Sequence, residues 1–171
     1  MAMFVALIIV GAFIRIPMPL VPFTLQTLFV LLAGALLGGI KGAICVLIYI
    51  FMGLIGIPVF ANGGGISYVL TPTFGFTIGF AVGAFVTGFI VEKSKKVTYP
   101  NLIFATSMGT LAIYVCGILY YILIKSLYFG ESFDFWNVLL YFWIVFIPTD
   151  ILKGAVVVVG AKKLLPILSR M

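Results

Sequence analysis

Two opposite charges lie close together in a strongly apolar part of the chain. Asp150 and Lys153 belong to the run Pro-Thr-Asp-Ile-Leu-Lys, within a segment that predicts a helix from about Trp136 to Leu164. At positions i and i+3 the two side chains share one helix face and can form an ion pair. A charge deep in a membrane costs at least about 2.5 to 3.5 kcal/mol, so both must face protein or water. The pair predicts a substrate or ion site, and a buried ion pair that only fixes packing is the alternative.

A polar, glycine-rich run, Phe60-Ala-Asn-Gly-Gly-Gly-Ile-Ser-Tyr68, interrupts the apolar segments and predicts a loop. Asn62 can donate and accept hydrogen bonds, and glycines such as Gly64 let backbone groups approach a small molecule without obstruction by a Cβ atom. Tyr68 can stack on a ring or hydrogen-bond to it. We expect this loop to form a lid or wall of a binding site. A plain flexible turn is the alternative, and Tyr68 could equally belong to an aromatic belt at the membrane interface.

Thr24, Gln26 and Thr27 place further hydrogen-bonding groups near the start of the second predicted helix. Gln26 is a candidate for contact with a ligand, whereas capping of the helix, to which Thr24 is suited, is the alternative. Small residues also recur at four-residue spacing, which allows helices to approach closely, either within the bundle or against a partner. These pairs are Ala2 with Ala6, Gly34 with Gly38, and Gly79 with Gly83.

The residue types of the chain give little indication of a catalytic or metal site. Histidine is absent, and Cys45 and Cys116 each lie deep in an apolar run, where a thiol packs as a small residue. We therefore expect no disulfide, metal or cofactor. The chain also lacks a glycine-rich Walker loop, so active transport must draw energy from a partner or an ion gradient. We expect a transporter subunit rather than an enzyme. A membrane enzyme using Asp150 as acid or base and a scaffold subunit are the alternatives.

Composition indicates the environment that holds these groups. Of 171 residues, 64% are hydrophobic and only 8% are charged. Because a crossing needs roughly 20 apolar residues, the sequence predicts about six membrane helices in a single domain, residues 1–171. The predicted fold class is an all-α, polytopic integral membrane protein. The net charge of +6 fits an excess of basic residues in cytoplasmic loops, so we expect a lipid bilayer and no nucleic acid as a partner.

The apolar segments set the expected helix boundaries, which are about 1–14, 24–39, 43–57, 72–91, 102–124 and 136–164. Prolines between Arg15 and Phe23 predict an extended loop, and residues 125–135 predict a polar loop. Placing the run of Lys93, Lys95 and Lys96 in the cytoplasm puts both chain ends there as well. The longer loops then share the outer face.

Several motifs together resemble a known family. They are Pro-Leu-Val-Pro-Phe-Thr-Leu-Gln-Thr27, Leu-Leu-Ala-Gly-Ala-Leu-Leu-Gly-Gly39, Gly-Leu-Ile-Gly-Ile-Pro-Val-Phe-Ala61, Pro-Thr-Phe-Gly75 and the pair of Asp150 and Lys153. On these residues the sequence resembles the BioY family, the biotin-specific S component of energy-coupling factor (ECF) transporters in bacteria and archaea. The similarity extends over nearly the whole chain.

The resemblance implies a six-helix S-component fold in a prokaryotic plasma membrane, with biotin bound from the outer face under loops 15–23 and 58–71. It implies docking, through Ala2 and Ala6, onto a transmembrane coupling (T) subunit that carries two ATP-binding-cassette ATPases. The residues expected to contact the substrate are Asp150, Lys153, Asn62, Tyr68, Gln26 and Gly64. Lys153 could meet either the ureido oxygen or the carboxylate of biotin. An S component for another vitamin is the closest alternative, since a fold alone does not fix the ligand.

Overall fold

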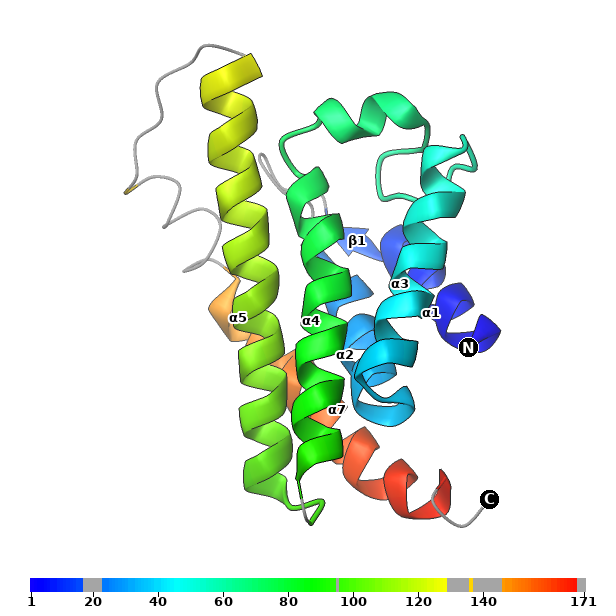
Figure 1. Cartoon of the computed structure of the whole chain (residues 1–171), viewed down its shortest axis with the longest axis vertical. Coiled ribbons are helices and arrows are strands. Elements are labelled where there is room, and N and C mark those ends of the chain that lie inside the picture. The colour runs from blue at the N-terminus through cyan, green and yellow to red at the C-terminus, as the bar shows by residue number, and fades with distance from the viewer. Residues whose placement is uncertain (17–22, 95, 129–135, 137–145, 169–171) are drawn as a thin grey trace.

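The apolar segments form helices that pack side by side (Figure 1). The computed structural model describes residues 1–16, 23–94, 96–128, 136 and 146–168. Its elements are α1 (Ala2–Phe13), β1 (Arg15–Ile16), β2 (Phe23–Thr24), α2 (Gln26–Leu37), α3 (Gly39–Leu54), η1 (Ile66–Leu70), α4 (Phe74–Lys93), α5 (Tyr99–Leu123), η2 (Ile124–Tyr128) and α7 (Ile147–Leu168). Among the described residues the only strands are β1 and β2, which pair antiparallel over two residues each. The expected all-α class is therefore confirmed.

Gly38 joins α2 directly to α3. Its φ of 89° lies in the left-handed region that favours glycine, so the chain reverses within a single residue. For this reason α3 begins at Gly39, several residues earlier than the sequence predicts. The backbone N–H of Gly39 donates to a carboxylate oxygen of Glu92 on α4 at 3.2 Å, which satisfies one of the free N–H groups at the helix start.

α4 and α5 form an antiparallel pair, and α5 extends over most of the length of the molecule (Figure 1). By length and composition, Phe74–Lys93 and Tyr99–Tyr128 are long and apolar enough to cross a membrane. The sequence predicts a polar loop from Lys125, but the chain continues as the π-helical turn η2 (Ile124–Tyr128). That predicted boundary was wrong, since a lysine at a helix end can extend its side chain toward water without breaking the helix. Residues 129–135 lie outside the described part.

Glycines bring these helices into close contact. A Cβ atom on Gly34 of α2 would collide with the backbone of Ala84 on α4. One on Gly83 of α4 would lie 2.8 Å from the carbonyl oxygen of Gly109 on α5, and Gly79 meets α5 in the same way. The close approach predicted from the four-residue spacing is confirmed for these glycines, and α4 lies between two tightly packed neighbours.

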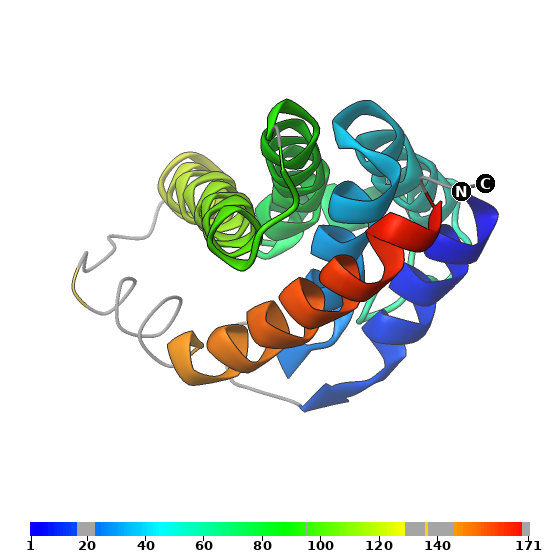
Figure 2. The same ribbon diagram turned by 90° about the horizontal axis from the view of Figure 1, so that it is seen from below.

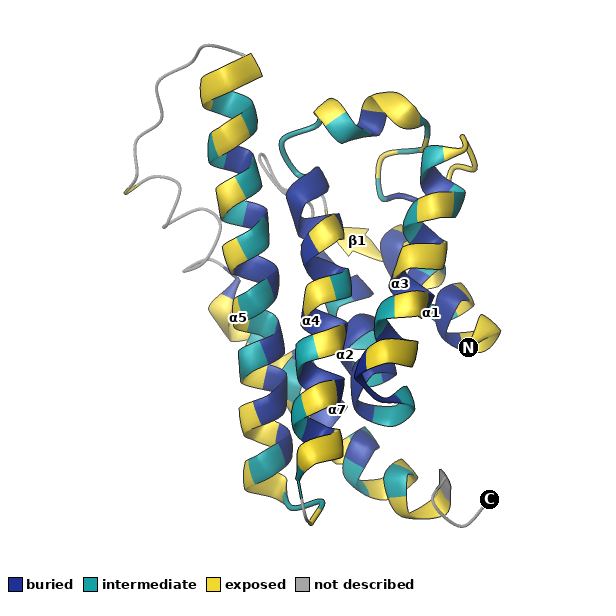
Figure 3. Ribbon diagram, viewed as in Figure 1, coloured by how far each residue is buried: buried dark blue, intermediate teal, exposed yellow. Residues whose placement is uncertain are grey.

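The outward faces of the bundle are apolar. Figure 3 shows exposed residues along the outer sides of the helices, and many of them are large hydrophobic side chains. Phe51 on α3 and Leu119 on α5, for example, are 65% and 58% exposed. Apolar exposure on this scale is typical of a bundle that is surrounded by lipid.

α7 crosses one side of the bundle and packs against α2 and α5 (Figure 2). Near its C-terminal end, the Lys162 ammonium donates a hydrogen bond to the carbonyl of Val97, in the turn between α4 and α5. The C-terminal end of α7 and the basic turn that follows Lys93 therefore lie at the same end of the molecule. This agrees with their expected placement on one side of the membrane.

Candidate functional site

The ion pair predicted from the sequence forms at the start of α7. Lys153 Nζ lies 2.7 Å from Asp150 Oδ1, and the two side chains are only 6% and 11% exposed. Thr149 donates its hydroxyl to the Phe146 carbonyl at 2.7 Å, and Pro148 suits the first turn, where its missing N–H costs nothing. A carboxylate in the first turn also interacts favourably with the helix dipole.

The position of this pair along its helix differs from the sequence prediction. The prediction placed Asp150 well inside a helix starting near Trp136, whereas the described helix starts at Ile147. Asp150 therefore lies in the first turn of α7. Residues 137–145 lie outside the described part, so the helix predicted over them is untested. The pair itself is buried, as the sequence argument requires.

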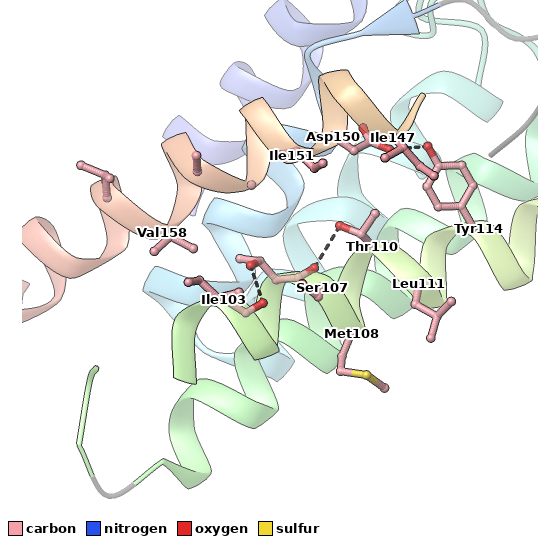
Figure 4. Close-up of a pocket in the computed structure, with 14 residues that line it drawn as sticks. Ile103, Ser107, Met108, Thr110, Leu111, Tyr114, Ile147, Asp150, Ile151 and Val158 are labelled. Atoms are coloured by element: carbon pink, nitrogen blue, oxygen red, sulfur yellow. Dashed lines mark hydrogen bonds between the residues drawn. The ribbon is translucent and has the colours of Figure 1, made fainter. Parts of the chain in front are cut away.

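Tyr114 on α5 contacts the ion pair, and the sequence alone does not reveal this contact. Its hydroxyl donates to Asp150 Oδ2, across the contact between α5 and α7 (Figure 4). Both oxygens of the Asp150 carboxylate thus have donors, one from Lys153 and one from Tyr114. Tyrosines are common in this chain, and only the packing of α5 on α7 selects this one.

The aromatic ring of Phe23 covers the other partner of the ion pair. Lys153 Nζ lies 4.4 Å from the ring centroid, a cation–π contact, and the ring stacks on Phe146 with centroids 6.3 Å apart. Phe23 belongs to β2, so the two-stranded ribbon of β1 and β2, at the end of the proline-rich run, lies directly over the ion pair. The predicted proximity of this loop to the site is consistent with that contact.

Gln26 faces the interior beside the ribbon. Its amide nitrogen donates to the Tyr49 hydroxyl at 2.7 Å, and its amide oxygen accepts from Thr24 at 3.4 Å. Thr24 does not cap α2: the N-cap is Leu25 and no side chain caps it. The capping prediction was wrong because Thr24 pairs with Arg15 in the ribbon, which fixes its backbone outside the helix.

Tyr68 packs into an aromatic cluster under the glycine-rich loop. Its ring lies 4.5 Å from that of Phe60, which contacts Tyr49 edge-on at 5.4 Å. Through Tyr49 this cluster continues to Gln26, so two predicted site residues from distant segments share one layer. Burial raises the pKa of the Tyr68 hydroxyl, against smaller opposing effects of Thr73 and its other polar neighbours, so it remains a neutral hydrogen-bonding group.

Asn62 and Gly64 lie on the exposed surface of the same loop. The side-chain oxygen of Asn62 accepts a hydrogen bond from the Arg15 guanidinium, which also donates to the Ala61 carbonyl. A Cβ atom on Gly64 would collide with the carbonyl of Ile57, so this glycine lets the loop pack on the end of α3. The close backbone contact that Gly64 allows is therefore with Ile57 of the same chain.

An open groove of about 640 Å³ runs between α5 and α7 from the Tyr114–Asp150 contact (Figure 4). Its walls include Ile103, Ser107, Ile151 and Val158. The polar end at Asp150 opens into a mostly apolar space, which suits a molecule with one polar head and an apolar body.

Comparisons with known proteins agree with one another. Residues 1–170 match the BioY family. A probable biotin transporter BioY from Lysinibacillus sphaericus is 54% identical over 119 residues, which are 70% of this chain and 61% of that protein. Another, from Pyrococcus horikoshii, is 40% identical over 164 residues, or 95% of this chain and 92% of that protein. A crystal structure of the S-component for biotin from an ECF-type ABC transporter matches with a TM-score of 0.81 and 29% identity, over 95% of this chain and 87% of that one.

Proposed function

The chain belongs to the BioY family, and on that premise we propose that it is the biotin-capturing S component of an ECF transporter in a prokaryotic plasma membrane. The observation that carries the proposal is the buried pair of Asp150 and Lys153, held in a fold similar to that of a biotin S-component. Buried charges that are retained in an apolar bundle usually mark a substrate or ion path.

The chemistry of the pair matches the polar head of biotin. A ureido group offers two N–H donors and one strong acceptor oxygen. Asp150 supplies acceptor oxygens and Lys153 supplies donors, 2.7 Å apart and on one helix face. Because both are nearly excluded from water, hydrogen bonds to them are stronger than they would be at the surface. Asn62, Gly64 and Tyr68 from the glycine-rich run, with Gln26 at the start of α2, complete the proposed site.

Capture and energy supply are separate tasks in this proposal. The subunit would bind biotin from the outer face and hand it on with a T subunit and two ATP-binding-cassette ATPases. Ala2 and Ala6 of α1 are exposed on the bundle surface, where small side chains permit close approach of a partner helix. The membership of a transporter family also argues against an enzymatic role for Asp150.

Equilibrium binding of labelled biotin to the purified chain in detergent tests this function. We expect saturable binding that unlabelled biotin displaces and that thiamine and riboflavin do not. Displacement by another vitamin at a lower concentration than unlabelled biotin would show that this vitamin is the substrate instead. Absence of saturable binding in folded protein would remove the proposed role altogether.

A further inference from the structure

Arg15 is exposed to solvent beside the glycine-rich loop. It lies in β1, opposite Thr24. Its Nη1 atom donates to the Ala61 carbonyl and to the Asn62 side-chain oxygen, and Nη1 carries only two hydrogens. The loop therefore fixes the group in place through one nitrogen. No hydrogen bond from Nε or Nη2 is formed within the described part of the chain, and the edge formed by these two atoms is a fork suited to a bidentate carboxylate contact.

The charge of Arg15 is not neutralised by any carboxylate in the described part of the chain. Both of its hydrogen-bond acceptors there are uncharged oxygens. Lys153 differs, because its ammonium is paired with Asp150 at 2.7 Å and the pair carries no net charge. An anion approaching these groups is thus attracted by Arg15, whereas the buried pair offers it a cation and an anion side by side.

We propose that the Nε and Nη2 edge of Arg15 binds the carboxylate of the substrate, while Asp150 and Lys153 hold its uncharged ureido head. The inference rests on the proposed function and assigns the two ends of biotin to two different sites. Asn62 takes a defined role in this arrangement. Its oxygen is engaged by Arg15, so its amide nitrogen is the group that remains to donate to the same carboxylate.

The alternative is a purely structural role, in which Arg15 only holds the glycine-rich loop against the β1–β2 ribbon. The two roles differ in what they require of the ligand. A residue with a purely structural role supports the binding of any ligand under the loop, charged or not. A carboxylate receptor supports only the ligand that carries the negative charge.

The experiment compares biotin with its neutral primary amide, biotinamide, by equilibrium binding to the purified full chain. In Arg15→Gln we expect biotin to bind about ten-fold more weakly, as for loss of a charge-assisted bidentate contact, with biotinamide affinity unchanged within about two-fold. Asn62→Asp keeps the acceptor that holds Arg15 but supplies an internal carboxylate. It should lower biotin affinity by a similar factor while the loop stays attached.

Lys125→Gln is the matched control, since it removes a cation of η2, an element that lies outside the glycine-rich loop. It should leave both ligands unaffected, which separates a specific contact from general attraction of anions. Equal loss of affinity for biotin and biotinamide in Arg15→Gln would show that Arg15 has a purely structural role and would overturn the inference. Unchanged affinity for both ligands would overturn it as well. Failure of the unaltered chain to bind either ligand would instead contradict the proposed function.

Discussion

At the scale of single residues, the Asp150 carboxylate has a hydrogen-bond donor at each of its two oxygens. Lys153 holds one of its oxygens and Tyr114 holds the other. Its side chain is only 11% exposed, so these hydrogen bonds are formed largely out of water. Substitutions here should therefore separate the charge of the site from its shape.

Asp150→Asn keeps the shape and one acceptor oxygen but removes the charge. One ureido hydrogen bond should weaken from charge-assisted to neutral, a loss of roughly 1 to 2 kcal/mol or about five- to thirty-fold in affinity. Asp150→Ala should cost more, because it leaves Lys153 without its partner. Labelled-biotin binding measures both.

Lys153→Met removes the donor of the same pair. If the two residues act as one unit, the double variant should lose far less than the sum of the single losses. Affinities within about two-fold of the unaltered protein in all the single variants, with the protein folded, would mean that the pair is purely structural.

Tyr114→Phe leaves Asp150 Oδ2 without its protein donor. Loss of a hydrogen bond to a charged group costs about 1.5 to 3 kcal/mol, so the ligand-free variant should melt at a lower temperature. A ureido N–H can take the place of the hydroxyl, and biotin should then raise the melting temperature of the variant more than that of the unaltered chain. Thermal unfolding in detergent, with and without biotin, provides the measurement.

Tyr120→Phe provides the control for this prediction. Tyr120 lies on the same helix and donates its hydroxyl to the Val69 carbonyl. Its loss should lower the melting temperature without enlarging the effect of biotin. A biotin shift of equal size in all of the proteins would show that the ligand does not use Asp150 Oδ2.

At the scale of elements, α1 has one face buried against the bundle and one exposed face. Phe4, Val5 and Ile8 are buried against the bundle. Ala2 and Ala6 lie on the exposed side, so they contribute little to the core of the chain. The small side chains at these two exposed positions would permit close contact with another helix.

Ala2→Trp or Ala6→Trp should spare biotin binding and reduce biotin uptake in cells that contain the coupling subunit and ATPases. The physical reason is that a close helix contact with a partner tolerates only small side chains. Leu47→Trp, on an exposed position of α3, controls for bulk facing lipid. Loss of binding together with uptake would indicate that the alanines serve packing within the chain.

At the scale of the whole molecule, the two ends of the bundle differ in character. One end carries the glycine-rich loop and η1, and the other carries Lys93 and the C-terminal end of α7 (Figure 1). We propose that the second end lies in the cytoplasm, because basic residues are in excess there. A substrate site reached from the first end then faces outward.

Cysteine labelling of Ser67→Cys in sealed right-side-out vesicles tests this orientation, in a chain whose Cys45 and Cys116 are replaced by alanine. Ser67 is exposed in η1, so a membrane-impermeant reagent should label it, and added biotin should slow the reaction. Lys41→Cys, at the basic end, should stay unlabelled until the vesicles are opened. Labelling of Ser67→Cys at the same rate with and without biotin would count against an outward-facing site under this loop.

The sequence by itself determined the features that depend on near neighbours in the chain. The apolar segments predicted the helices, because the composition of each segment sets its affinity for lipid. The spacing of Asp150 and Lys153 predicted their ion pair, because side chains three residues apart in a helix are neighbours whatever the rest of the fold does. The four-residue spacing of glycines predicted close helix contacts for the same reason.

Tertiary structure alone decided which distant residues meet these groups. Tyr114 reaches Asp150 across 36 residues of sequence, and Arg15 reaches Asn62 across 47. Each contact depends on the rotation and depth at which one element packs on another, which no local pattern specifies. For the same reason Thr24 is not the N-cap of α2 that the sequence predicts, because its pairing with Arg15 fixes its backbone outside the helix. The pair could therefore be read from the sequence, while the groups that surround it could be found only once the helices were packed.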